Sequence, residues 1–458
     1  MKENAYFDNA ATTWPKPEPV YAFMDAFFRS HGVNPGRGGH ALAVEAERTI
    51  VQTRTMLARF FGFSGPPERV VFAQNGTDAL NLALGGLLSS GDHLVTTRLE
   101  HNAVLRQTSH LERDRNVSVA RVAPRADGYV RAGDLESVIR PDTRAIVVNH
   151  ASNVTGAVQP LAEIAEVARR ASLPLVVDAA QTAGVVPIDM DELGIALLAC
   201  PGHKGLFGPM GIGVLIVAES VELRPTRFGG TGVDSASVYQ PEAYPHRLEA
   251  GTVSVPGIAG LFAAQHWFAE LGARLASGDE RSGEATDERT RRALDAAVAG
   301  AVAARLDDLD AVRVAENHGA LCRRAIAHVH ATELSHLARI ERALAVHPRV
   351  SVLGRDGTRV TGGAGAEGSP ARVATLSFTV DGVAAERVAD ELDADHGVCA
   401  RAGLQCAPLV HEDAGTVEAG GTVRLSPGYF TDEEDMAQLL GALDAVLGEP
   451  DVARVGGR

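Results

Sequence analysis

The stretch LPLVVDAAQTAG, residues 173–184, changes from apolar to polar within one short segment. Its first half is rich in β-branched and other apolar residues, which favours a strand buried on both faces. The run ends in Asp178, and Gln181 follows three residues later. Five further runs of this kind alternate with helical patterns; they are RVVFA (69–73), DHLVTT (92–97), VSVARV (117–122), AIVVNH (145–150) and GIGVLIV (211–217). This alternation predicts an α/β domain with a mostly parallel sheet, in which ligands bind at the carboxyl ends of the strands.

The chain of 458 residues is longer than one hydrophobic core usually supports, so we expect two domains. We assign residues 20–262 to a large domain, and residues 1–19 with 263–458 to a small domain. A second strand and helix pattern in the C-terminal part indicates that the small domain is α+β. The region from about 275 to 318 is rich in charge and alanine, which predicts a solvated helical insertion or a partly disordered segment.

The composition is that of an ordinary soluble globular protein, with 45% hydrophobic and 22% charged residues. A formal net charge of -15 argues against general affinity for nucleic acid. No apolar run approaches the roughly 20 residues of a membrane helix, and the first residues lack an apolar signal segment. We therefore expect a cytoplasmic protein that does not bind membranes. The cysteines lack the spacing of a disulfide framework or a zinc site, so we predict no metal.

A single lysine lies in the glycine-rich stretch CPGHKGLFGPMGIG, residues 200–213. Surface lysines usually lie on polar helix faces, whereas Lys204 has almost no charged neighbours in the sequence. Together with Asp178 it predicts a site for pyridoxal 5'-phosphate (PLP), in which Lys204 holds the aldehyde as a Schiff base and Asp178 faces the pyridinium nitrogen. A carboxylate about 4 Å from that cation contributes about 4 kcal/mol at an effective dielectric constant of ~20. The alternative for Asp178 is a helix N-cap.

The stretch AQNGTDALN, residues 73–81, places Gly76 and Thr77 where a strand turns into a helix. Free N–H groups and a hydroxyl at a helix start bind anions, so we expect the cofactor phosphate there, with His203 as a further donor. The alternative is a plain Thr N-cap. His101 follows another strand, and its imidazole would stack on the pyridine ring and shuttle protons. Taken alone, either histidine is better explained by a structural role.

Ten motifs together resemble those of one family in type and order. They resemble the class V aminotransferase-fold enzymes, and most of all the cysteine desulfurase and selenocysteine lyase branch with the short active-site loop. The motifs are YFDNAATTWPKP, NPGRGGHAL, NGTDALNLA, EHNAVL, SNVTG, VVDAAQTAG, GHKGLFGPMGIG, RLEAGT, RAGLQCAP and VRLSPGYF. The resemblance spans nearly the whole chain except the region from 275 to 318. It implies a fold-type I PLP-dependent transferase, with a large domain on a mostly parallel seven-stranded sheet, a smaller C-terminal α+β domain, and a homodimer whose active sites lie at the subunit interface.

The resemblance also implies which residues carry the chemistry. Asp178 would face the ring nitrogen, Gln181 the ring hydroxyl and His101 the ring face. The remaining cofactor residues are Gly76, Thr77, His203 and Lys204, with Thr252 of the partner subunit. The family binds the substrate carboxylate, or shapes its pocket, at the positions of Asn153, Arg401 and Arg424.

Cys406 takes the position of the sulfur-accepting cysteine. It lies in a loop near Arg401, in surroundings that favour a reactive thiolate. The alternative is a buried, inert cysteine, which is what we expect of Cys200, Cys322 and Cys399.

The implied reaction converts L-cysteine to L-alanine, with Lys204 moving the α-proton. Cys406 takes the sulfur as a persulfide, which an acceptor protein or thiol then collects. Pro201 stands where many members of the branch have Ser or Thr, and Leu404 and Gln405 stand where the best-known members have histidines. The departure at Pro201 removes one phosphate hydroxyl, which backbone donors or Thr252 must replace. Those at Leu404 and Gln405 leave open the sulfur acceptor and the discrimination between cysteine and selenocysteine. The alternatives are a selenocysteine lyase, a cysteine sulfinate desulfinase, another class V reaction, or a non-catalytic scaffold; a scaffold would have no reason to keep a buried aspartate.

Overall fold

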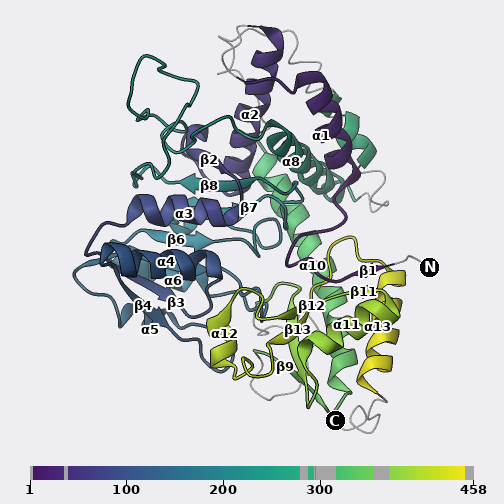
Figure 1. The fold of residues 1–458 in the computed structure, drawn as a ribbon. Helices are drawn as coiled ribbons and strands as arrows, with labels where there is room; N and C mark the ends of the chain where they lie inside the picture. The colour runs from purple at the N-terminus through teal and green to yellow at the C-terminus, as the bar shows by residue number, and fades with distance from the viewer. Residues whose placement is uncertain are drawn as a thin grey trace.

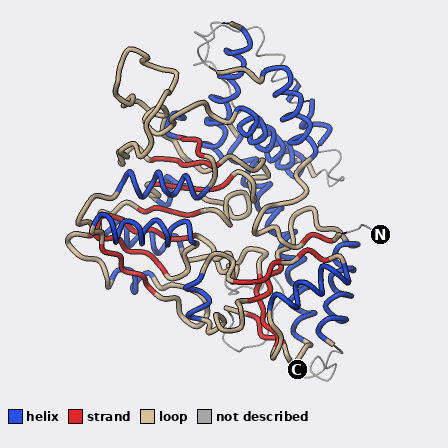
Figure 2. The backbone as a smooth tube through the Cα atoms, in the orientation of Figure 1, coloured by secondary structure: helices blue, strands red, loops and turns tan. Residues whose placement is uncertain are grey.

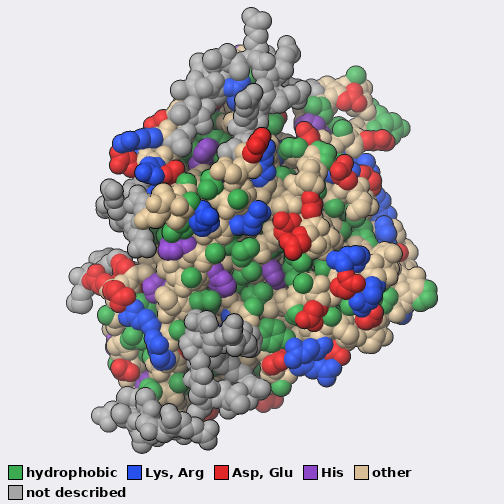
Figure 3. Space-filling model, turned by 180° about the vertical axis from the view of Figure 1, so that it is seen from behind, with side chains coloured by type: hydrophobic (Ala, Val, Ile, Leu, Met, Phe, Trp, Pro, Cys, Tyr) green, Lys and Arg blue, Asp and Glu red, His purple; other side chains and the backbone are tan. Residues whose placement is uncertain are grey.

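The computed structural model describes residues 4–35, 40–278, 287–292, 294–295, 316–354 and 371–448. Figure 1 shows two parts, a large layered one that holds most of the N-terminal half and a smaller one that holds most of the C-terminal half. Within the described part of the chain, no helix is long and apolar enough to cross a membrane. On the face seen in Figure 3, acidic and basic side chains are interspersed, so neither sign forms a continuous patch there.

A seven-stranded sheet forms the centre of the large part, with the strand order β2-β8-β7-β6-β5-β3-β4. Its strands are β2 (Val70–Ala73), β3 (His93–Thr97), β4 (Ser118–Val122), β5 (Thr143–Asn149), β6 (Leu175–Asp178), β7 (Leu197–Pro201) and β8 (Gly213–Val217). The strands from β3 to β7 pair in parallel, whereas β8 is antiparallel to both β7 and β2. The predicted mostly parallel seven-stranded sheet is therefore confirmed.

Strand β7 is the one strand of this sheet that the sequence patterns did not indicate. It carries the short run LLACP, in which alanine, cysteine and proline lack the β-branched signal of the other strands. Its pairing with both β6 and β8 decides its conformation. This strand leads directly to Lys204.

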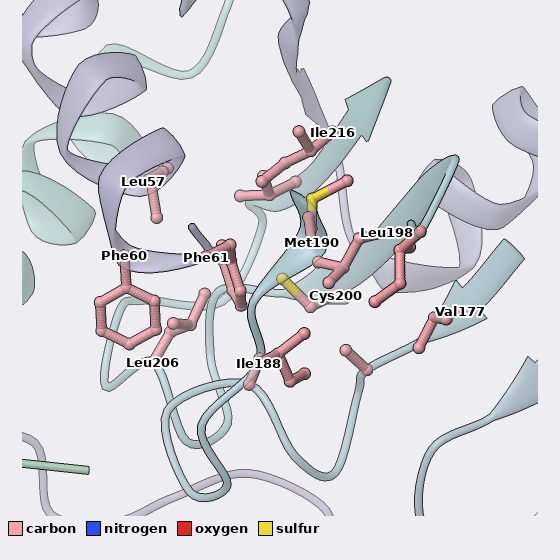
Figure 4. Packing of buried hydrophobic residues seen from close by; sticks show 14 of the residues in the cluster. Leu57, Phe60, Phe61, Val177, Ile188, Met190, Leu198, Cys200, Leu206 and Ile216 are labelled. Atoms are coloured by element: carbon pink, nitrogen blue, oxygen red, sulfur yellow. The ribbon is translucent and has the colours of Figure 1, made fainter. Parts of the chain in front are cut away.

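Alternate residues of the central strands enter two hydrophobic cores on opposite faces of the sheet, as the period of a strand requires. Val177, Leu198 and Ile216 lie in one core, whereas their neighbours Val176, Leu197 and Leu215 lie in the other. Figure 4 shows Cys200 inside the first core between Leu198 and Leu206. The prediction that Cys200 is a buried structural cysteine is confirmed.

Helices cover both faces of the sheet (Figure 2). Those between the strands are α3 (Gly76–Leu87), α4 (Asn102–Arg115), α5 (Ala132–Glu136), α6 (Leu161–Arg170) and α7 (Met190–Leu193), and a 3₁₀ turn (Pro67–Arg69) precedes β2. Four longer helices pack together at one side; they are α1 (Glu18–His31), α2 (Ala41–Phe60), α8 (Val255–Ala276) and α10 (His318–Ala345).

The small part is built on an antiparallel sheet with the order β12-β13-β10-β9. Its strands are β9 (Val350–Val352), β10 (Leu376–Val380), β12 (Arg401–Gly403) and β13 (Thr422–Leu425), and its helices are α11 (Ala385–His396), α12 (Pro408–Asp413) and α13 (Glu433–Leu447). The N-terminal segment joins this part, because β1 (Ala5–Tyr6) pairs with β11 (Val398–Cys399). Segments from the N-terminal and the C-terminal parts of the described chain thus lie together in the small part.

The predicted boundary between residues 262 and 263 falls inside α8, whose Phe262 and Phe268 both enter the core of the large part. The division into residues 20–262 and residues 1–19 with 263–458 stays a prediction. The predicted insertion at about 275–318 lies mostly outside the described residues.

Candidate active site

The segment that carries Lys204 packs backbone to backbone against the turn that follows β6. A Cβ on Gly184, whose φ is +83°, would lie 2.0 Å from the carbonyl oxygen of Gly205. A Cβ on Gly205 would in turn lie 2.5 Å from the carbonyl oxygen of Ala183. Only glycine allows so close an approach. The glycines around Lys204 therefore bring the lysine next to the carboxyl end of β6, where Asp178 lies.

The N-terminal segment holds the same loop from the other side. The carbonyl oxygen of His203 accepts hydrogen bonds from Thr12 Oγ1 at 3.0 Å and Lys16 Nζ at 2.5 Å. Thr13 Oγ1 donates to the carbonyl oxygen of Lys204 at 3.0 Å. Burial lowers the pKa of Lys16 to about 7. These contacts were not predicted, since nothing in the motif YFDNAATTWPKP indicates a partner almost 200 residues away.

Lys204 and Asp178 influence each other electrostatically at the end of the sheet. Burial lowers the pKa of Lys204 to about 8, and the negative charge of Asp178 opposes this shift. Burial raises the pKa of Asp178. Two smaller influences lower it: the N–H of Ala180, which donates to Asp178 Oδ1 at 2.9 Å, and the positive charge of Lys204. A turn and not a helix follows Asp178, so the N-cap alternative for this residue is wrong.

His101 lies at the N-cap of α4, where its Nδ1 accepts a hydrogen bond from the N–H of Ala103 at 3.0 Å. Burial lowers its pKa to about 4, and the charge of Lys204 adds to this shift. The imidazole is therefore neutral near pH 7 and carries its proton on Nε2. The adjacent Glu100 is fully buried, and burial raises its pKa to about 8.

Helix α3 begins against the end of β7. Its N-cap is Asn75, whose Oδ1 accepts a hydrogen bond from the N–H of Asp78 at 2.9 Å, so the alternative in which Thr77 caps the helix is wrong. A Cβ on Gly76 would lie 3.0 Å from Pro201 Cδ, which explains the glycine at this helix start. The side chain of Thr77 is exposed.

His203 Nδ1 is buried, and the described residues offer it no hydrogen-bond partner. Burial lowers the pKa of His203 to about 4. Gln181 lines a small cavity together with Lys204 and Asn9, and its Nε2 donates to the carbonyl oxygen of Ala10 at 3.1 Å.

Asp8 joins the two predicted substrate arginines. Its Oδ1 accepts from Arg424 Nη2 at 2.6 Å, and its Oδ2 accepts from Arg401 Nε at 2.9 Å. Arg424 is buried and also donates through Nη1 to the carbonyl oxygen of Asn153 at 3.1 Å. No local sequence pattern indicates Asp8, because 393 and 416 residues separate it from its partners.

Cys406 is the exposed cysteine at this site, so the alternative of a buried, inert residue is wrong. Cys200 and Cys322 are buried, and Cys399 is half-buried. The carbonyl oxygen of Cys406 accepts a hydrogen bond from the N–H of Asn102 at 2.7 Å, which places the cysteine loop beside His101.

Thr252 lies apart from Lys204 within this chain. It lines a cavity of about 730 Å³ beside the buried ion pair of Arg54 and Glu249, whose N and O atoms are 2.8 Å apart. The structure thus brings together the predicted residues around Lys204, Arg424 and Cys406, and leaves Thr252 beside a second cavity.

A family model described as aminotransferase class-V matches residues 5–303 and 314–439. The chain belongs to the class V aminotransferase family. Within this family it is similar to a protein of Methanothermobacter thermautotrophicus named "Probable cysteine desulfurase", with 30% identity over 455 residues, which are 98% of this chain and 96% of that protein. The cysteine desulfurase IscS of Anaeromyxobacter dehalogenans is 33% identical over 305 residues, covering 64% of this chain and 69% of that protein.

A solved structure supports the same assignment. The apo structure of a cysteine desulfurase from Thermococcus onnurineus has a TM-score of 0.75 and 26% identity, covering 97% of this chain and 95% of that chain. The resemblance to the cysteine desulfurase branch of the class V family is confirmed, and so is the class V fold.

Proposed function

We propose that this chain is a PLP-dependent cysteine desulfurase, which converts L-cysteine to L-alanine and takes the sulfur onto Cys406 as a persulfide. One observation supports this most strongly: a half-buried amine and an exposed thiol both lie near Arg401. The charges of Arg401 and Arg424 both act on the pKa of Lys204, and Cys406 in turn acts on the pKa of Arg401.

The residues around Lys204 fit PLP, since several of them have unused bonding capacity. Among the residues that the structure describes, none forms a hydrogen bond with the buried His203 Nδ1. Asp178 is a buried carboxylate whose one hydrogen bond within the described chain comes from Ala180. PLP, when bound, supplies an electron sink that weakens the bonds at the α-carbon of an amino acid.

Each of these residues then has a defined task. Lys204 would hold the cofactor through Nζ and, as a neutral amine, move the α-proton of the substrate. Asp178 would keep the ring nitrogen protonated, because a buried carboxylate favours a cation beside it. Gln181 would donate to the ring hydroxyl, and the neutral imidazole of His101 would cover the ring face.

The phosphate would lie at the start of α3, where the first N–H groups of the helix point outward. Gly76, Thr77 and His203 supply its donors in this chain. Thr252 of the partner subunit would complete the set in a homodimer, which we also propose. The cytoplasmic location stays a prediction.

The substrate carboxylate would bind Arg424 and Arg401, with Asn153 beside them. The Cys406 thiolate attacks the substrate sulfur; as the S–S bond forms, the Cβ–S bond breaks and its electron pair stays with Cβ. Protonation of Cβ gives the methyl group of alanine. Because Cys406 is exposed, an acceptor protein or a small thiol can reach the persulfide.

The test is a product assay on the purified protein with PLP, L-cysteine and a reductant, in which alanine and sulfide are both measured. Cys406→Ser should lower cysteine turnover by about 100-fold or more while the yellow colour of the bound cofactor remains. Cys399→Ser is the matched control and should change turnover less than about twofold. A fully active Cys406→Ser protein would contradict the persulfide step. Wild-type protein that acts on selenocysteine or cysteine sulfinate but not on cysteine would show that this is another class V reaction.

A further inference from the structure

Gln405, the residue before Cys406, has the opposite exposure to its neighbour. Gln405 is buried, whereas Cys406 is exposed. Both residues lie in the left-handed region, with φ of 41° and 57°. Two successive non-glycine residues rarely adopt this conformation unless their surroundings hold them there. The contacts of Gln405 show what holds them.

Both the nitrogen and the oxygen of the Gln405 side-chain amide form hydrogen bonds. Its Nε2 donates to the carbonyl oxygen of Thr422 at 2.8 Å. This fixes the orientation of the amide, so Oε1 faces the Nε2 of His411 at 2.9 Å and the hydroxyl of Thr422 at 3.3 Å. His411 Nδ1 lies 2.8 Å from Thr416 Oγ1, and burial lowers the pKa of His411. A neutral His411 with its proton on Nε2 satisfies every one of these contacts.

The backbone of the loop is fixed in the same way. The carbonyl oxygen of Gln405 accepts from Asn153 Nδ2 at 2.6 Å, and that of Cys406 accepts from the N–H of Asn102 at 2.7 Å. The N–H of Ala407 closes the turn on the carbonyl oxygen of Leu404 at 2.9 Å. The peptide groups around the Cys406 Cα are therefore tied to a residue of the proposed substrate pocket and to the neighbour of His101.

We propose that Gln405 is a positioning residue for sulfur transfer: its buried amide, held by His411 and Thr422, fixes the backbone of Cys406 so that the thiol is already placed beside the substrate. This proposal rests on the proposed function. Attack on the substrate sulfur depends on alignment, so a displacement of the loop by about 1 Å strongly lowers the rate of sulfur transfer. Turnover of cysteine sulfinate, which need not use a protein thiol, does not depend on this alignment.

The test uses Gln405→Met in the holoenzyme, because methionine fills a similar volume without hydrogen-bonding the carbonyl of Thr422. The kcat for cysteine should fall by about tenfold or more, while KM for cysteine changes less than about threefold and turnover of cysteine sulfinate less than about twofold. Gln438→Met is the matched control, since Gln438 Nε2 donates to the carbonyl oxygens of His396 and Gly397 in the same part of the molecule at 2.8 and 3.2 Å. It should change none of these values more than about twofold.

Hydrogen exchange on substrate-free protein provides a readout that does not depend on activity. The amides of Asn102 and Ala407 should exchange about tenfold faster or more in Gln405→Met, and at the wild-type rate in Gln438→Met. Unchanged exchange would overturn the proposal, and so would faster exchange with unchanged cysteine turnover, since Gln405 would then be structural only. If wild-type protein fails to act on cysteine, the proposed function fails, whereas the exchange rates still decide whether Gln405 holds the loop.

A second variant covers the case in which Gln405→Met does not fold. Thr422→Val removes one donor to Gln405 Oε1 and keeps the carbonyl that Gln405 contacts. The same pattern, with a smaller loss of cysteine turnover of about threefold, would support the proposal. Equal losses of cysteine and cysteine sulfinate turnover would overturn it.

Discussion

The loops of Lys204 and Cys406 carry the two reactive groups of the proposed reaction in opposite surroundings. The Lys204 loop lies at the end of the central sheet, where backbone packs directly on backbone at Gly184 and Gly205. The Cys406 loop is exposed at its tip and is held by side-chain hydrogen bonds from Gln405. Burial thus sets the chemistry of the amine, by lowering its pKa, whereas backbone conformation sets the placement of the thiol. Substitutions in the two loops should therefore affect turnover and stability differently.

The largest effect is expected from Lys204→Ala. This variant removes the covalent anchor and the base together, so turnover of cysteine and of cysteine sulfinate should both fall by at least ~10⁴-fold. Steady-state assays on both substrates measure it. Cys406→Ser, in contrast, should lose only the cysteine reaction. Similar losses of both activities in both variants would erase the difference between the loops.

Substitutions near the two loops should also differ in their effect on the free energy of unfolding. Gly184→Ala places a Cβ 2.0 Å from the carbonyl oxygen of Gly205, at a positive φ, and should lower the free energy of unfolding by about 3 kcal/mol or more. Gly415→Ala lies after α12, also at a positive φ, but no atom lies within 4 Å of the added Cβ. It should cost only about 1 kcal/mol. Urea unfolding midpoints of the cofactor-free proteins would test the order; equal midpoints would mean that the Lys204 loop has room to move.

The pH dependence of cofactor uptake should reveal the lowered pKa of the Lys204 amine. Only the neutral form of Lys204 attacks the PLP aldehyde, and its pKa is lowered to about 8 by burial. The rate of PLP binding to cofactor-free protein should therefore rise about tenfold per pH unit below pH 8 and level off above it. Stopped-flow absorbance measures this rate. A rate that keeps rising to pH 10 would show that the amine is not desolvated.

The smallest effect is expected at Leu404, next to Gln405. Its backbone carbonyl closes the turn with Ala407, and any residue supplies that carbonyl. Leu404→His should therefore change cysteine turnover less than about twofold, although it restores a residue type found in the best-known members of the branch. If Leu404→His lowered cysteine turnover more than Gln405→Met does, Leu404 and not Gln405 would be the positioning residue, which would contradict the proposal.

Sequence patterns predict the central sheet and the cofactor residues because these are local signals. A β-branched run that ends in Asp178, and glycines around Lys204, can be recognised within about a dozen residues of chain. Strand β7 was missed, since its run LLACP has no local strand signal and takes its conformation from the neighbouring strands.

The contacts that tune the site could not be predicted in the same way. Asp8 meets Arg401 and Arg424 across most of the chain length, and Gln405 looks like any polar loop residue until His411 and Thr422 are placed around it. Such contacts depend on how the N-terminal segment, β12, α12 and β13 pack together in the small part. No pattern within one segment indicates them.

The central claim is that Lys204 holds PLP covalently, and borohydride reduction of the holoprotein tests it most directly. Reduction followed by proteolysis and mass spectrometry should find a pyridoxyl group on the peptide that contains Lys204. A pyridoxyl group on Lys16 or another lysine, or on no peptide of a protein that has bound PLP, would contradict the account.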